Sequence, residues 1–132
     1  MKLEDQVCSI EPSKKLKELG VKHDSLFYWS YGCLDELSLQ IGIKEGNSLT
    51  PITNISAFTV AELGEMLPKI IEDGNNRNIR YHLHILFREH DNDWLIKFER
   101  GNGGILHFCS DGKEADARAK MLIYLKEKEI KK

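Results

Sequence analysis

The sequence has few of the features that mark an enzyme, a disulfide-rich protein or a membrane protein. It contains only three cysteines, Cys8, Cys33 and Cys109, and no C-x-x-C pair. An odd number leaves one thiol unpaired in any disulfide scheme within one chain, which favours a reduced, cytoplasmic protein. No apolar run approaches the ~20 residues of a membrane span, and residues 1–15 lack the apolar core of a signal peptide. We therefore expect no membrane association.

A strong net charge is also absent. The 132 residues carry 19 Lys and Arg against 21 Asp and Glu, a net charge of −2, so no overall field attracts the protein to nucleic acid. The hydrophobic fraction of 41% and the charged fraction of 30% are those of an ordinary globular protein. This length and composition predict a single domain covering residues 1–132.

The first half of the chain predicts a helix followed by a β-hairpin. Residues 11–21, EPSKKLKELGV, have a helical pattern of apolar positions with a glycine near the end. Residues 25–31 are rich in aromatic side chains, and residues 34–43 alternate apolar with polar ones, so both segments are expected to be strands. A turn at residues 32–33 would join them. The turn-rich stretch 44–56 is interpreted as a loop.

A second helix is expected to begin after this loop. Thr59 and Glu62 match a capping box, in which each side chain bonds the backbone N–H of the other residue. Pro68 lacks an N–H and would clash with the preceding turn, so the helix should stop or kink near residues 66–67, with a further turn from Pro68. The expected apolar face consists of Val60, Leu63, Leu67, Ile70 and Ile71.

The second half predicts a three-stranded antiparallel meander followed by a helix. Strands are expected in residues 80–89, 93–100 and 104–110, joined by the short connections EHDN and GNG. The register that places the large apolar side chains on one face pairs Leu83 with Phe98, Ile85 with Ile96, Phe87 with Trp94, Phe98 with Leu106, and Ile96 with Phe108. The chain should thus be an α+β protein with the order α-β-β-α-β-β-β-α.

The last predicted helix covers residues 111–128. Asp111 is in position to cap it, with Glu114 three residues later. Its buried stripe is expected to consist of Ala115, Ala119, Leu122, and Leu125 or Ile123. The small alanines would let this helix approach the sheet closely.

The predicted register turns histidines towards the outward side of the sheet. His82 should lie opposite Glu99, and His84 opposite Lys97. His107 and Cys109 would share this face, but nearly 10 Å away and with Lys97 between them. A metal site needs three or four ligands at ~2 Å, so we predict no metal, cofactor or catalytic residue here. A metal-binding or enzymatic role for His82, His84, His107 and Cys109 stays as an alternative.

Apolar side chains on the same outward face indicate an interaction surface. We expect this surface to consist of Leu86, Leu95, Lys97, Glu99 and Ile105. Exposed apolar patches often mark interfaces, and a second copy of the chain could cover this one. A homodimer, or another protein partner, is therefore expected.

Four segments resemble a group of small uncharacterised proteins encoded by phages, prophages and related mobile elements. In order they are VCSIEPSKKLKELGV (7–21), SLFYW (25–29), AFTVAELGEMLP (57–68) and EADARAKMLIYL (114–125). The resemblance covers most of the chain and departs most at residues 32–54. It implies a cytoplasmic protein and carries over no catalytic residue. The leading interpretation is a small non-enzymatic interaction protein of a phage or prophage.

The order of elements in residues 59–127 is similar to that of the double-stranded-RNA-binding domain. That family grips two minor grooves with its helices and one strand-connecting loop. The matching basic positions are Lys113, Arg118 and Lys120, with acids at Asp111, Glu114 and Asp116 among them. These acids would repel phosphates where the family attracts them. Nucleic-acid binding through this unit is the alternative function that the resemblance implies.

Overall fold

The computed structural model describes residues 5–21, 25–31, 37–41, 55–72 and 79–128. Within these ranges the helices are α1 (Ile10–Glu18), α2 (Val60–Met66) and α3 (Glu114–Glu127). The strands are β1 (Phe27–Tyr31), β2 (Leu37–Ile41), β3 (Ile55–Ser56), β4 (Ile70–Glu72), β5 (Arg80–Arg88), β6 (Asp93–Glu99) and β7 (Ile105–Asp111).

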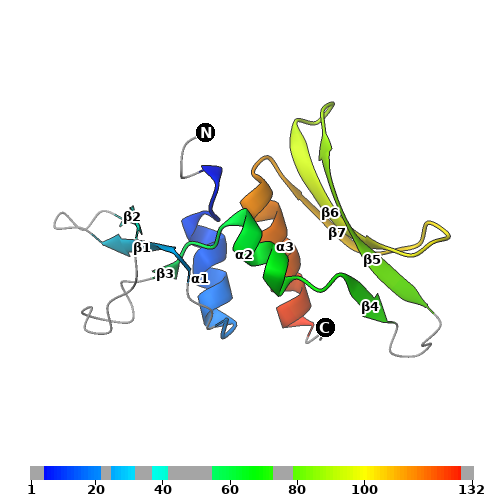
Figure 1. Cartoon of the computed structure of the whole chain (residues 1–132), viewed down its shortest axis with the longest axis horizontal. Helices are drawn as coiled ribbons and strands as arrows, with labels where there is room; N and C mark the ends of the chain where they lie inside the picture. The colour runs from blue at the N-terminus through cyan, green and yellow to red at the C-terminus, as the bar shows by residue number, and fades with distance from the viewer. Residues whose placement is uncertain (1–4, 22–24, 32–36, 42–54, 73–78, 129–132) are drawn as a thin grey trace.

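The predicted α+β class is confirmed. Two antiparallel sheets have the strand orders β2-β1-β3 and β4-β5-β6-β7, and we call the second one the large sheet. The helices lie between the two sheets, with α3 beside the large sheet and α1 towards the small one (Figure 1). The C-terminal meander therefore has four strands and not the three that were predicted.

The additional strand β4 follows directly from Pro68. Helix α2 ends at Met66, as the proline predicted, and the capping box at its start is present, with Thr59 and Glu62 bonded to each other in both directions. The prediction of a further helical turn is wrong, because the residue before a proline favours the extended region and Leu67 has ψ of 132°. Ile70 and Ile71 therefore belong to a strand paired with β5, and they do not extend the apolar face of α2.

The first hairpin is confirmed in its pairing. Strand β1 pairs with β2 in antiparallel register, with Trp29 opposite Leu39. The expected turn at residues 32–33 lies outside the described residues, as do residues 44–54 of the expected loop. The end of that loop is not irregular, because Ile55–Ser56 form β3 on the other side of β1. Two residues are too few to show a strand period in a sequence.

The register of β5 with β6 is confirmed, whereas that of β6 with β7 is wrong by one residue. Ile96 lies opposite Cys109, and Phe98 lies opposite His107, since a β-bulge shifts the pairing between Phe98 and Glu99. A shift of one residue moves every later side chain to the other face of the sheet. Phe108 therefore points away from the helices, while His107 and Cys109 point towards them.

Helix α3 is buried on two sides. It packs against β6 and β7 on one side and against α1 and α2 on the other, so one hydrophobic cluster joins all three helices to the large sheet. The predicted stripe is buried at Ala115, Ala119, Leu122 and Leu125, but so are Asp116, Ala117 and Met121. The predicted cap is wrong, because Asp111 ends β7 and Lys113 occupies the N-cap position.

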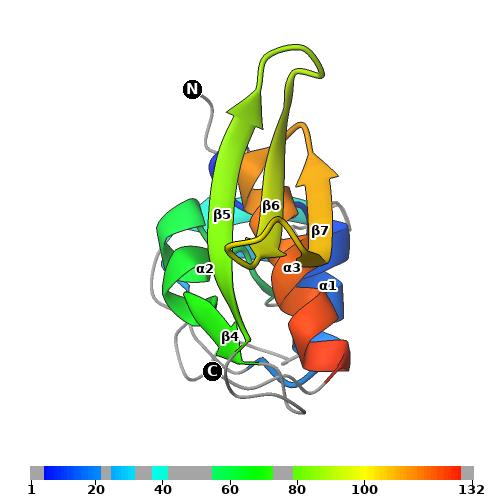
Figure 2. The ribbon, with the colours of Figure 1, turned by 90° about the vertical axis from the view of Figure 1, so that its right-hand side faces the viewer.

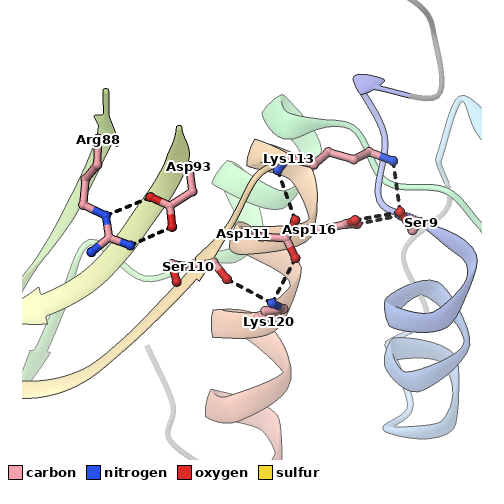
Figure 3. Close-up of polar contacts among 8 residues, drawn as sticks. All are labelled: Ser9, Arg88, Asp93, Ser110, Asp111, Lys113, Asp116 and Lys120. Carbon is pink, nitrogen blue, oxygen red and sulfur yellow. Dashed lines mark hydrogen bonds and ion pairs between the residues drawn. The ribbon is translucent and has the colours of Figure 1, made fainter. Parts of the chain in front are cut away.

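A buried carboxylate connects the start of α1 to the first turn of α3. Asp116 accepts hydrogen bonds of 2.6 Å each from the backbone N–H and the hydroxyl of Ser9, the N-cap residue of α1 (Figure 3). The Ser9 hydroxyl oxygen in turn accepts a bond of 3.1 Å from the Lys113 ammonium. This arrangement explains why an acidic side chain can lie in the interior, since each carboxylate oxygen accepts a hydrogen bond.

Candidate functional site on the outward face of the large sheet

The surface of the large sheet that points away from α3 is the strongest candidate site, and we call it the outward face. Figure 2 looks onto this face, and no helix or strand of the described ranges lies over it. The turn between β6 and β7 projects from it (Figures 1 and 2). An antiparallel sheet can leave one face to solvent, but such a face is then normally polar.

Apolar side chains are unusually exposed on this face. The exposed fractions are 43% for Ile70, 38% for Leu86, 51% for Ile105 and 59% for Phe108. One comes from β4, one from β5 and two from β7, so every strand but β6 contributes. A monomeric protein rarely leaves several large apolar side chains uncovered on one sheet face.

All five residues predicted for the interaction surface lie on the outward face: Leu86, Leu95, Lys97, Glu99 and Ile105. Sequence reasoning missed Ile70 and Phe108. Ile70 was assigned to a helix, and Phe108 was placed in the core by the shifted register. A glycine-containing hairpin loop is compatible with a bulge, and this is the one signal that could have moved Phe108 outwards.

Two ion pairs involve polar residues of the outward face. The Lys97 ammonium lies 2.7 Å from a Glu99 carboxylate oxygen, and this hydrogen bond lowers the pKa of Glu99. At the tip of the β5–β6 hairpin, the Arg88 guanidinium donates two bonds of 2.8 and 2.7 Å to Asp93 (Figure 3) and lowers the pKa of that carboxyl. The charges within each of these two pairs compensate one another.

The alternative metal site does not assemble. His82 and His84 lie opposite Glu99 and Lys97 as predicted. The placement of His107 and Cys109 on this same face is wrong, because both turn inwards after the bulge. Among the residues that the structure describes, no group of three His, Cys, Asp or Glu side chains is placed to hold a metal ion. The four candidate ligands are therefore divided between two faces of the sheet.

The inward position of His107 and Cys109 changes their protonation chemistry. The His107 ring stacks on Tyr124 of α3 with the centroids 3.6 Å apart, and burial, followed by the charge of Lys128, lowers the pKa of His107. Burial raises the pKa of the Cys109 thiol to about 11, although nearby Lys120 acts in the opposite direction. A thiol with this pKa is protonated at neutral pH and is a poor nucleophile.

We predict that the stability of the protein falls when the pH drops below about 6.5. The folded chain holds the His107 proton less tightly than the unfolded chain, whose histidine has an ordinary pKa of 6.5. The contribution of neutral His107 is therefore fully present above that pH and is lost as the pH falls through the folded-state pKa. Urea unfolding at pH 7.5 and at pH 5.5, each about one unit from the ordinary histidine pKa, measures the difference in the free energy of unfolding.

Two variants isolate the source of this pH dependence. His107→Phe keeps a flat ring against Tyr124 but cannot be protonated, so the loss of stability between the two pH values should shrink. His90→Gln changes an exposed turn histidine and should leave the loss as it is. An unchanged pH dependence in His107→Phe would contradict the assignment.

A groove lies away from the outward face, where the starts of α2 and α3 approach Trp94. It has a volume of about 670 Å³. Its rim carries two acids, Asp5 and Glu114, and two basic side chains, Lys113 and Arg118. Arg118 donates to Glu114 at 2.6 Å, and Lys113 donates to Ser9. The groove is therefore electrically balanced, and its basic groups already have partners.

The basic residues that would contact RNA phosphates in the resemblance to the double-stranded-RNA-binding domain are all engaged. Besides Lys113 and Arg118, Lys120 lies 2.9 Å from an Asp111 carboxylate oxygen (Figure 3). The element order also differs, because β4 adds a fourth strand between α2 and α3. Binding to phosphates would therefore compete with these internal contacts.

The longest described helix, α3, has 14 residues. No helix in the described ranges combines the length and the apolar character that crossing a membrane requires. Comparisons of the chain with models of protein families, with curated proteins and with solved structures found no match. The outward face and the groove are therefore interpreted from their own chemistry.

Proposed function

We propose that the chain is a small non-enzymatic interaction protein that self-associates through the outward face of the large sheet. The observation that carries this proposal is the exposure of Ile70, Leu86, Ile105 and Phe108 on one face of the large sheet, whose other face packs against the hydrophobic cluster. Water is excluded from such side chains most simply by a second protein surface. The resemblance of residues 57–68 and 114–125 to phage and prophage proteins supports a cytoplasmic role in a mobile element.

The size of the apolar patch favours a reversible association. Complete burial of one large apolar side chain contributes about 1.5–3 kcal/mol, so four side chains that are about half exposed offer roughly 4 kcal/mol per copy. Association itself costs about 4–15 kcal/mol in lost freedom of motion. The two terms are similar, so we expect a dimer that forms at high protein concentration and dissociates on dilution.

The alternative functions receive less support from the contacts. An enzyme or metal protein would need side chains that converge, and the histidine and cysteine candidates lie on two different faces. Nucleic-acid binding would need free basic groups at the start of α3, where Lys113, Arg118 and Lys120 are all bonded within the chain. We therefore infer that the outward face binds a protein partner.

Sedimentation velocity over a wide range of concentrations tests the proposal. The wild-type protein should shift from monomer to dimer as its concentration rises, and the double variant Ile105→Glu/Phe108→Glu should stay monomeric because charge opposes burial of the patch. Leu26→Glu is the matched control, because Leu26 is 65% exposed but does not belong to the large sheet. A wild-type protein that remains monomeric throughout, or a double variant that still dimerises, would refute the proposal.

A further inference from the structure

We propose that the second copy adds to the free edge of β7, so that two large sheets join into one continuous antiparallel sheet around a two-fold axis at Phe108. This inference rests on the proposed self-association and narrows its contact to the β7 end of the outward face, where Ile105 and Phe108 lie, so Ile70 and Leu86 stay outside it. In this geometry the copies are joined by backbone hydrogen bonds of β7 as well as by exposed side chains. The proposed function alone does not require the backbone bonds.

Strand β7 is the longer of the two edges of the large sheet. The strand order β4-β5-β6-β7 leaves β4 and β7 at the edges, and β7 has seven residues where β4 has three. It contains no proline, which would block pairing. A long unpaired edge is a template on which another strand can form hydrogen bonds.

The direction of the backbone groups of β7 can be inferred from a contact of Lys120. The Lys120 ammonium, which comes from α3, donates a bond of 2.9 Å to the backbone carbonyl of Ser110 (Figure 3). The sheet pairing gives the same direction, because Leu83 donates its N–H to the Lys69 carbonyl on the β4 side of β5, and alternation across β5, β6 and β7 then directs the Ser110 carbonyl away from β6. Neighbouring residues of a strand direct their backbone groups to opposite sides, so residues two apart direct them to the same side. The N–H and C=O of Phe108, two residues before Ser110, therefore also point to the free edge.

The turn between β6 and β7 favours edge addition over face-to-face packing. This turn, with Arg100 and Gly104 bonded across it, projects from the outward face (Figures 1 and 2). It would keep two copies from lying flat against each other. Addition at the free edge of β7 avoids this obstacle, because the second sheet continues the first one in its own plane.

The side chains of the β7 edge are compatible with a copy of themselves. A two-fold axis at Phe108 places Ile105 of one copy beside Asp111 of the other, so the one charged residue of β7 does not face its own equivalent. The outward side chains of β7 are Ile105, Phe108 and Ser110, and none of them is charged. Each edge strand contains one acid with an ionic partner: Asp111 of β7 lies 2.9 Å from Lys120, and Glu72 of β4 lies 3.5 Å from Arg80. The greater length of β7 and the absence of like charges facing each other across the axis favour β7 and a second copy of the chain as the partner.

An axis at Phe108 gives the pairing an apolar centre. In a hydrogen-bonded antiparallel pair the two Cα atoms lie about 5.5 Å apart, so the two Phe108 rings would be neighbours on the outward face. Each ring is 59% exposed in the single chain and would be covered by the other. The two strands would exchange both N–H to carbonyl bonds of Phe108.

Lys120 limits this pairing at one end of the edge. Its ammonium covers the Ser110 carbonyl, which the second strand would otherwise reach, and lysine at an edge is a known protection against uncontrolled pairing. Lys120 also lies 2.9 Å from Asp111, so it can release Ser110 and keep an ionic partner. This competition keeps the dimer reversible.

Two substitutions of Phe108 test the backbone contact by sedimentation velocity. Phe108→Pro and Phe108→Ala both remove the ring, but only proline removes the N–H that points to the free edge, and an edge strand tolerates proline there. We expect Phe108→Ala to weaken dimerisation and Phe108→Pro to abolish it. Lys120→Ala should lower the dissociation constant. Equal association of the proline and alanine variants would overturn the inference.

A third variant distinguishes the inference from the proposed function. Leu86→Glu changes the outward face on β5, two strands away from β7, and should leave dimerisation intact. If Leu86→Glu abolishes dimerisation and Phe108→Pro does not, the copies meet face to face, so the edge geometry fails and self-association stands. A wild-type protein that never dimerises refutes both.

Hydrogen exchange of backbone amides in the wild-type protein tests the pairing at β7 without a proline variant. Exchange of the Phe108 amide should slow as the protein concentration rises, because its N–H becomes bonded in the dimer. The Cys109 amide, which faces β6, should be protected at every concentration. A Phe108 amide that exchanges equally fast in the monomer and in the dimer would exclude pairing at this edge, even if the proline variant fails to fold.

Discussion

Replacement of Phe98 by alanine is expected to lower the free energy of unfolding by about 3–5 kcal/mol. Phe98 is completely buried on β6, where it faces the hydrophobic cluster that contains α3. Truncation removes the apolar surface of the ring and leaves a cavity that the surrounding side chains fill only in part. Urea unfolding at neutral pH, at a dilution where the chain is monomeric, measures the change.

Phe108→Ala is the matched control, because it makes the same chemical change on the neighbouring strand. Phe108 is 59% exposed on the outward face, so its truncation should change the free energy of unfolding by no more than about 0.5 kcal/mol. The register predicted from the sequence placed both rings in the core and would make both substitutions severe. Similar losses for the two variants would therefore contradict the bulged register.

Replacement of Asp116 by alanine is expected to cost about 2–4 kcal/mol, because two strong hydrogen bonds are lost together. The carboxylate is only 9% exposed and accepts bonds of 2.6 Å from the backbone N–H and the hydroxyl of Ser9. Without it, the N–H at the start of α1 loses its partner, and the nearby Lys113 ammonium loses a compensating charge. Thermal and urea unfolding of the purified variant measure the loss.

Two further aspartate variants show whether the carboxylate itself is responsible. Asp116→Asn preserves the shape and one acceptor oxygen, so it should cost clearly less than Asp116→Ala. Asp91→Ala removes an exposed turn carboxylate that lies 3.6 Å from Arg88, and it should be nearly neutral. A cost for Asp116→Ala as small as that for Asp91→Ala would show that the contact between α1 and α3 contributes little.

The pairing of β5 with β6 could be predicted because period-two alternation and a short turn leave only one register that keeps the large side chains together. The same reasoning failed for β7, where Leu106 and Phe108 alternate with His107 and Cys109. Hydrophobicity favoured the first pair for the core, but the bulge after the glycine-containing turn shifts the strand by one residue. His107 stacks on Tyr124 in the shifted register, and this stabilising contact joins residues that are distant in the sequence.

The short strands escaped prediction for a different reason. Strand β4 has three residues and β3 has two, so neither shows a period that could be separated from a helix end or a loop. Their positions are set by pairing partners that the local sequence does not reveal. For the candidate site, the positions of Leu86, Leu95, Lys97 and Glu99 followed from the correct register. Ile70 and Phe108 depended on the two features that were missed.

The burial of α3 on both sides has a consequence for how the chain acquires its structure during synthesis. Residues 114–127 follow α1, α2 and the large sheet in sequence, yet they form the surface on which all of these pack. Until this helix leaves the ribosome, Phe98 and the side of α1 that packs against α3 lack this partner. The nascent chain should therefore stay open and accessible to chaperones until residues 114–127 have emerged, and then close in one cooperative step.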